Sequence, residues 1–139
     1  MKDSLVLIDT SVWIPALRKA SFPPFRERVQ ALLAENRVAI LPVIYLELLG
    51  GAGSQPEFER LKRRLEALHW VPIDEKGWEA AALLAFKLRR RGKPLPSTDV
   101  LVGAVALTHD LIVLHADRHY DIMAQEVPLE VESMVSLLG

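Results

Sequence analysis

The sequence predicts an α/β fold in which a central parallel β-sheet is flanked by helices on both faces. Short, continuous apolar runs such as residues 4–8 (SLVLI) are typical of strands that are buried on both faces of a parallel sheet. These runs alternate along the chain with longer segments of helical periodicity. The 139 residues contain no linker and no internal repeat, so we expect a single domain over 1–139.

The first half of the chain continues this alternation after the strand at 4–8. Two prolines near the start and apolar residues on one face predict a helix over 20–36. A second strand over 37–42 stops at its proline, and a short helix over 43–51 ends in two glycines. Residues 55–69 have the charge and apolar spacing of an amphipathic helix.

The second half of the chain repeats the pattern. A brief strand over 70–73 precedes an alanine-rich helix over 75–92. The segment 97–110 begins with hydroxyl residues that favour a helix N-cap, and a strand over 111–116 follows it. The last segment, 128–138, is ambiguous and fits a strand that leads into a short helix.

The composition excludes several classes of protein. Half of the residues are hydrophobic and a quarter are charged, which is ordinary for a globular domain and too apolar for a disordered one. The chain has no cysteine, so disulfides and thiolate metal sites are excluded, and a reducing cytoplasm is the expected location. No stretch approaches the ~20 apolar residues of a membrane span, so we expect no membrane association. The net charge of −1 gives no global attraction to nucleic acid.

Four acidic residues stand where apolar segments reach the expected carboxyl edge of the sheet. Asp9 directly follows the first strand, and Glu47 lies just beyond the second. Asp99 begins a helix, and Asp117 lies just beyond the strand that ends near Leu114. Ligands of open parallel sheets bind in the crevice at this edge. Buried acids that converge there need a cation, and oxygen-only ligands select Mg²⁺ or Mn²⁺.

Each of these acids also has an ordinary structural interpretation. Asp9 could cap a following helix, although the hydroxyls behind it suit that role more naturally. Glu47 could lie on a half-exposed helix, and Asp99 could complement a helix dipole from its first turn. Asp117 could close an Asx-turn. Only the joint placement of the four acids favours a metal site.

With these residues in view, the chain resembles PIN-domain ribonucleases. Among these it is most similar to the VapC-type toxins of bacterial and archaeal toxin–antitoxin pairs. The resemblance spans nearly the whole chain and is carried by LIDTSVWI (7–14), YLELLGG (45–51), STDVLVGAVAL (97–107) and LIVLHADRHYDIMA (111–124). The stretch DTSVWI is its most specific part.

The resemblance implies a PIN-like fold and a magnesium-dependent endoribonuclease, with Mn²⁺ as an alternative ion. It also implies that the protein acts as a toxin silenced by a small antitoxin protein, that its substrate is RNA and that it forms a homodimer. The competing hypothesis is a catalytically idle PIN-like module that binds RNA or protein. The presence of all four acids argues against an idle module, because a retired site should tolerate their loss.

The resemblance also implies roles for individual residues. The family's acids correspond to Asp9, Glu47, Asp99 and Asp117. In the family the first and third acids are the usual magnesium ligands, which here are Asp9 and Asp99. Glu47 and Asp117 would complete the pocket or help with a second ion. The hydroxyl residue after the first acid supports the site, which implicates Thr10, with Ser11 as a second candidate.

The chain departs from the family pattern near the fourth acid. His115 stands where the family often has threonine, and His119 replaces an acid before the aromatic residue. Asp121 lies nearby and is a candidate substitute for that acid. On an extended strand, His115, Asp117 and His119 would share one face, which is a zinc alternative.

Two basic segments are candidates for RNA contacts. Residues 86–94 carry five positive charges, among them Arg89, Arg90 and Arg91, and residues 60–64 add more. The alternative is that these charges complement helix C-termini and stay solvated. Arg118, adjacent to Asp117, is better placed to contact a phosphate, although an ion pair with a carboxylate is an equal alternative.

Overall fold

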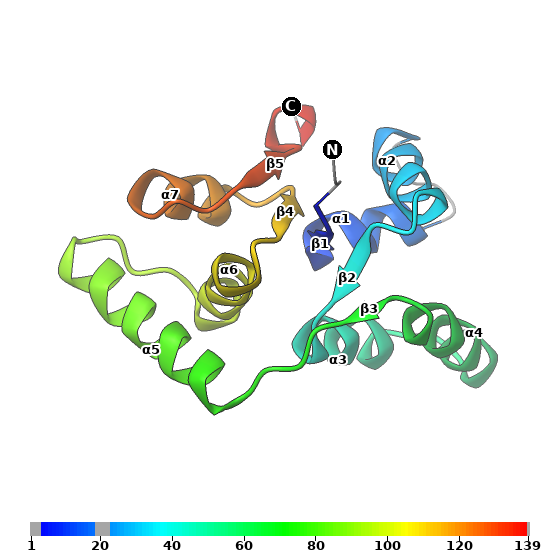
Figure 1. Ribbon diagram of the computed structural model, residues 1–139. Helices are drawn as coiled ribbons and strands as arrows, with labels where there is room; N and C mark the ends of the chain where they lie inside the picture. Colours follow the sequence, from blue (N-terminus) through cyan, green and yellow to red (C-terminus); the bar gives the residue numbers. More distant parts are fainter. Residues whose placement is uncertain (1–3, 19–22, 139) are drawn as a thin grey trace.

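The structure is a computed structural model in which residues 4–18 and 23–138 are described. Its centre is a five-stranded sheet with the strand order β3-β2-β1-β4-β5, and every neighbouring pair is parallel (Figure 1). The strands are β1 (Val6–Ile8), β2 (Val38–Ile40), β3 (His69–Trp70), β4 (Ile112–His115) and β5 (Val131–Ser133).

Helices cover both faces of the sheet, as the sequence predicts. In Figure 1, α5, α6 and α7 lie on one side of the strands, whereas α2 lies on the other and packs against α1. The helices are α1 (Thr10–Leu17), α2 (Pro23–Ala34), α3 (Pro42–Gly50), α4 (Gln55–Glu66), α5 (Glu75–Arg90), α6 (Ser97–His109) and α7 (Arg118–Glu126), and a short 3₁₀ helix, η1, spans Val135–Leu138.

The predicted elements are confirmed with shifted boundaries. Pro42 begins α3 as well as ending the second strand segment, because proline fits the first turn of a helix. The third strand is shorter than predicted and starts at His69. The helix predicted over 20–36 is described from Pro23 to Ala34, and residues 19–22 lie outside the described part. The ambiguous last segment forms a strand followed by a short helix.

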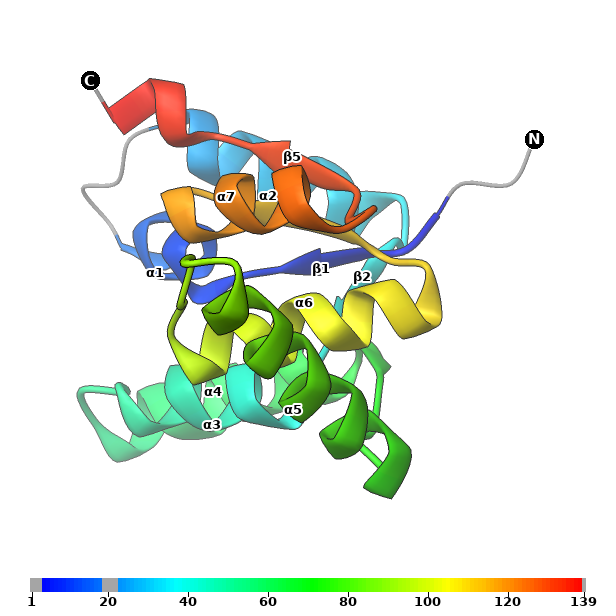
Figure 2. The ribbon, with the colours of Figure 1, turned by 90° about the vertical axis from the view of Figure 1, so that its left-hand side faces the viewer.

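The central strand explains the apolar run that opens the chain. Val6, Leu7 and Ile8 are fully buried because β1 pairs with β2 on one side and β4 on the other, with helices above and below. Parallel strands leave the sheet at a common edge. Figure 2 shows the result: the chain leaves β1 for α1, and enters α6 and α7, at the same side of the molecule.

Helix α6 is the most buried helix of the described chain, and it approaches α7 closely. Residues 100–106 of α6 are all buried. A Cβ atom added at Gly103 would lie 2.2 Å from the sulfur of Met123, which is itself fully buried on α7. Glycine therefore allows the two helices to pack together.

No helix in the described ranges 4–18 and 23–138 is long and apolar enough to cross a membrane.

Replacing Gly103 with valine should destabilise the protein. The new side chain overlaps Met123, and overpacking of a filled core typically costs ~1–3 kcal/mol. Gly50→Val is the matched control, because nothing lies within 4 Å of a Cβ at that position. Urea unfolding should show a loss for Gly103→Val and a change within ~0.5 kcal/mol for Gly50→Val. Equal effects of the two changes would contradict close packing of α6 on α7.

Candidate metal centre

The backbone brings the four predicted acids to the carboxyl edge of the sheet. Asp9 follows β1 directly and Asp117 lies two residues beyond the end of β4. Glu47 lies on α3, which follows β2, and Asp99 lies in the first turn of α6. Two helices and the ends of two strands therefore contribute to one region.

Asp9 is buried and held by hydrogen bonds on both of its oxygens. It is only 5% exposed. Its Oδ2 accepts hydrogen bonds from the Ser11 backbone N–H at 3.1 Å and from the Ser11 hydroxyl at 2.6 Å. Its Oδ1 accepts from the Tyr120 hydroxyl at 2.8 Å. These donors fix the carboxylate in a single orientation.

The Tyr120 hydroxyl connects two of the acids. The ring is fully buried, and its oxygen lies 3.3 Å from Oδ1 of Asp99 as well as 2.8 Å from Asp9. A phenol has one proton, so the shorter distance places its strongest bond on Asp9. Burial, together with the charges of Asp9 and Asp99, raises the pKa of Tyr120 and keeps it a neutral donor.

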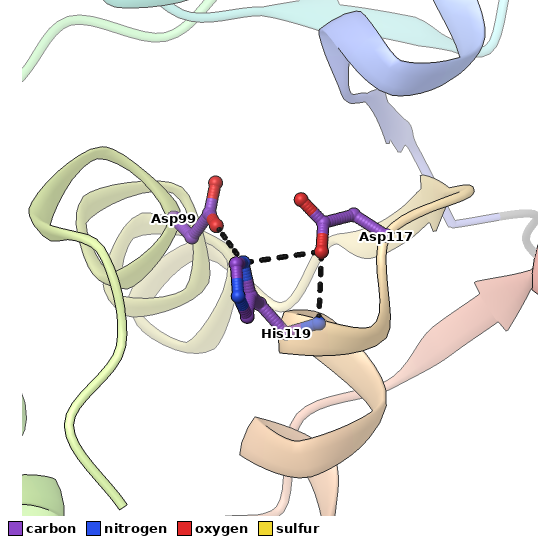
Figure 3. A group of neighbouring side chains, drawn as sticks. All are labelled: Asp99, Asp117 and His119. Carbon is purple, nitrogen blue, oxygen red and sulfur yellow. Dashed lines mark hydrogen bonds and ion pairs between the residues drawn. The ribbon is translucent and has the colours of Figure 1, made fainter.

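Asp99, Asp117 and His119 form a compact group of side chains (Figure 3). The Nδ1 atom of His119 lies 2.8 Å from Oδ2 of Asp99 and 3.1 Å from Oδ1 of Asp117. The His119 backbone N–H also donates to Oδ1 of Asp117 at 3.0 Å. Each residue offers one ligand atom, and the three atoms lie within 4.8 Å of one another.

The acids influence one another's protonation. Partial desolvation raises the pKa of Glu47, and the charges of Asp9 and Asp99 raise it further, although the side chain reaches solvent. Burial likewise raises the pKa of Asp99, the hydrogen bond from His119 lowers it, and the charges of Asp117 and Asp9 raise it. Negative charge is therefore concentrated at this edge, and a bound cation would relieve the repulsion.

The donor set fits a divalent metal ion. Asp99, Asp117 and His119 are the described residues whose ligand atoms gather closely enough to share an ion. Asp9 and Glu47 are not in that compact group, although their negative charges act on the same edge of the sheet.

The serine, rather than the neighbouring threonine, supports Asp9. Besides its two bonds to Asp9, the Ser11 hydroxyl accepts a hydrogen bond from the Ala116 N–H at 2.9 Å, which ties the start of α1 to the end of β4. Thr10, the residue that the resemblance implicates first, makes no side-chain hydrogen bond to any residue within 4–18 or 23–138. Asp9 itself caps α1, a role that the sequence analysis assigned more naturally to the hydroxyls.

Asp121 contacts Ser133 and His115 rather than the four predicted acids. Its Oδ2 accepts from the Ser133 hydroxyl at 3.0 Å, and its Oδ1 lies 3.2 Å from Nε2 of His115. Among the described residues that could share a metal, Asp121 does not join Asp99 and Asp117.

The zinc alternative on His115, Asp117 and His119 is not supported, because β4 ends at His115 and the alternation ends with it. His115 is fully buried, and its Nδ1 accepts the Asp117 N–H at 3.2 Å. Burial lowers the pKa of His115 despite the acids around it, so the ring is neutral and positions the Asp117 backbone.

The basic residues lie in two places. Arg89 and Arg90 form the end of α5, where Arg90 stacks over Phe86, and Arg91 donates to the Glu126 carbonyl at 3.0 Å. Arg118 is exposed at the start of α7 and lines a cavity of about 520 Å³ beside the acids. The cavity is also lined by Ser11, Asp117, His119 and Ser136.

Comparisons with known proteins agree with this architecture. Residues 6–126 match the PIN domain family. Ribonuclease VapC11 of Mycobacterium tuberculosis is 31% identical over 133 residues, which cover 93% of this chain and 98% of that protein. Ribonuclease VapC51 of the same species is 31% identical over 122 residues, which cover 85% and 84%.

Solved structures share the fold at lower sequence identity. The crystal structure of FitAcB from Neisseria gonorrhoeae has a TM-score of 0.75 at 23% identity and covers 91% of this chain and 96% of that chain. The structure of VapBC2 from Rickettsia felis, bound to a DNA fragment from its promoter, has a TM-score of 0.73 at 18% identity and covers 93% and 98%. A toxin–antitoxin complex from Klebsiella pneumoniae has a TM-score of 0.68 at 18% identity and covers 81% and 87%.

Cation binding should weaken as the pH falls. The pKa values of Asp99 and Glu47 are raised, so protons compete with a metal ion at higher pH than for ordinary carboxyls. Isothermal titration with Mn²⁺ at pH 7.5 and pH 5.5 should show weaker binding at the lower pH. Affinity that is equal at both values would contradict a site made of these carboxylates.

Proposed function

The chain belongs to the PIN domain family, and on that premise we propose that it is a metal-dependent endoribonuclease of the cytoplasm that acts as the toxin of a type II toxin–antitoxin pair. The single observation that carries the proposal is the concentration of carboxylates at one sheet edge, where the charges of Asp117 and Asp9 lie close enough to Asp99 to raise its pKa. A binding module without catalysis has no need of such repulsion.

The ion in this proposal is Mg²⁺ or Mn²⁺, with Asp9 and Asp99 as its principal ligands. Glu47 and Asp117 complete the pocket or help to hold a second ion. When bound, the ion neutralises the carboxylates, activates water and stabilises the charge that develops on the phosphate.

The protein's own groups prepare the site for hydrolysis. Asp9 is held by Ser11 and Tyr120, so it pays no entropy of ordering when a ligand arrives. Glu47 reaches solvent, and its raised pKa makes it a stronger proton acceptor than an ordinary glutamate. We propose that Glu47 accepts a proton from the attacking water. The water oxygen bonds to phosphorus as the bond between phosphorus and the leaving oxygen breaks.

The substrate in this proposal is single-stranded RNA. Arg118 has no ion pair with any residue in the described ranges and lines the cavity next to Asp117, so it is the nearest free cation for a phosphate of the bound strand. Arg89 and Arg90 are exposed and extend the positive charge at the end of α5, where they would contact RNA farther along the strand. Arg91 is engaged with Glu126.

A small antitoxin is the protein partner, and we assign it to the groove between α1, α2 and α4. This cavity has a volume of about 630 Å³, and Leu17 and Leu33 line it while 40% and 41% exposed. Trp13 lines the same groove, and its indole N–H is buried with no hydrogen-bond partner in the described part of the chain. Arg26 and Arg64 favour a segment that also carries acidic side chains.

A second copy of the chain is the other partner that we propose. Leu46 on α3 is 68% exposed, and Trp78 and Phe86 on α5 are 56% and 58% exposed. Large apolar side chains with this exposure are typical of surfaces that a partner covers.

RNA cleavage by the purified chain should require both Mg²⁺ and Asp99. Asp99→Asn should lower the rate of single-stranded RNA cleavage by roughly 100-fold or more, because several kcal/mol of transition-state stabilisation depend on the bound ion. Asp110→Asn is the matched control at the other end of α6, where an exposed residue has φ 56° and asparagine fits equally well. Gel electrophoresis of the products measures the rates. Cleavage that persists in excess EDTA or in Asp99→Asn would sink the proposal.

Co-expression tests the antitoxin assignment. The product of the open reading frame immediately upstream should co-purify with the chain and suppress its toxicity. Leu33→Glu should abolish this co-purification, because it places a charge in the apolar groove, and RNA cleavage should persist. Leu137→Glu is the control, since Leu137 is a comparably exposed leucine at 43% that lines neither the groove nor the cavity beside the acids. Retained binding by Leu33→Glu would show that the partner docks elsewhere.

A further inference from the structure

We propose that His119 is a nitrogen ligand in the cation site, so that the site prefers a first-row transition ion such as Mn²⁺ over Mg²⁺. The inference rests on the proposed metal-dependent function and deepens it, because it concerns which ion the site selects. It rests on the imidazole of His119, which would add a nitrogen ligand to the carboxylate oxygens.

The first observation is the position of the ring. Nδ1 of His119 lies 2.8 Å from an oxygen of Asp99 and 3.1 Å from an oxygen of Asp117 (Figure 3). The two acids belong to different helices, since Asp99 lies in the first turn of α6 and Asp117 is the N-cap of α7. The ring nitrogen therefore faces the same space as both carboxylates, with ligand atoms within 4.8 Å of one another.

The second observation is that the turn holds this arrangement in place. Oδ1 of Asp117 accepts the His119 backbone N–H at 3.0 Å, so the acid and the histidine are fixed relative to each other in one turn. The next residue, Tyr120, is fully buried and bonds to Asp9. The His119 side chain is 39% exposed, which leaves its ring free to tilt from a hydrogen bond to a coordination bond.

The other nearby histidine cannot take this role. His115 is fully buried, its Nδ1 accepts the Asp117 N–H, and its Nε2 lies against Asp121. Of the two histidines in the stretch HADRH, only His119 has a ring nitrogen that gathers with the carboxylates of Asp99 and Asp117.

A nitrogen ligand changes the selectivity of the site. Mg²⁺ prefers oxygen ligands and retains much of its water, whereas imidazole binds first-row transition ions well. Among those ions, affinity rises from Mn²⁺ onward for a given set of ligands. A site that combines carboxylates with His119 therefore discriminates against Mg²⁺ more strongly than a site made of carboxylates alone.

Pulsed electron paramagnetic resonance of bound Mn²⁺ tests the proposal without RNA. The wild-type chain should show hyperfine coupling to an imidazole nitrogen, and His119→Gln should lose it. Loss of the ligand should also weaken Mn²⁺ binding by at least ~10-fold, the lower limit for disturbing a metal site's supporting contacts. His109→Gln is the control, because His109 is exposed in the last turn of α6, and it should keep the coupling.

A second variant keeps the test independent of folding. His119→Asp supplies an oxygen ligand in place of nitrogen, so it should bind both ions with a smaller preference for Mn²⁺ over Mg²⁺ in calorimetry. Tighter Mn²⁺ binding by His119→Gln would overturn the proposal, because His119 would then be an internal cation that competes with the metal.

The outcomes separate the inference from the proposed function. If the wild type binds Mn²⁺ without nitrogen coupling, and Asp99→Asn abolishes that binding, the inference fails and the proposed function stands. If the wild type binds neither ion, the metal-dependent function fails as well.

Discussion

The hydroxyl of Tyr120 lies between Asp9 and Asp99, and the arrangement of the site depends on this contact. Two carboxylates this close repel each other, so the fold must supply neutral donors or a cation between them. Tyr120 supplies one proton and Ser11 supplies two more donors, all of which reach Asp9. Asp99 has only the longer, 3.3 Å contact with the Tyr120 hydroxyl, and its other oxygen lies 2.8 Å from Nδ1 of His119. The contact of Tyr120 on α7 with Asp9 at the end of β1 therefore orders Asp9 and leaves Asp99 with fewer hydrogen-bond donors.

The acids serve structural and chemical purposes together. Asp9 caps α1 with one oxygen and turns the other toward Tyr120. Asp117 caps α7 through the His119 N–H while facing the His119 ring. A capping hydrogen bond holds the carboxylate in one orientation and leaves further lone pairs for other partners, so it can prepare a ligand rather than replace it. In the folded chain one carboxylate can therefore cap a helix and also face the metal site, two roles that the sequence presents as alternatives.

The sequence predicts the sheet and the position of the four acids at its carboxyl edge, because both follow from local rules. An apolar run that ends in an acid marks the carboxyl end of a buried strand, and parallel strands bring such ends together. The choice of Ser11 over Thr10 was also within reach, since an N-cap side chain bonds to the N–H two or three residues later. Tyr120 gave no local signal, because its role depends on a contact with Asp9, 111 residues away. The pairing of His115 with Asp121 depends on how β4 and α7 pack, which residue spacing alone does not specify.

Anomalous diffraction from crystals of the chain soaked in Mn²⁺ tests the central claim most directly, because it locates the ion relative to each carboxylate. We expect a strong anomalous peak within coordination distance of Asp9 and Asp99, at the edge where β1 and β4 end. Crystals with no peak there, or with Mn²⁺ bound elsewhere while His119 keeps its hydrogen bond to Asp99, would contradict it.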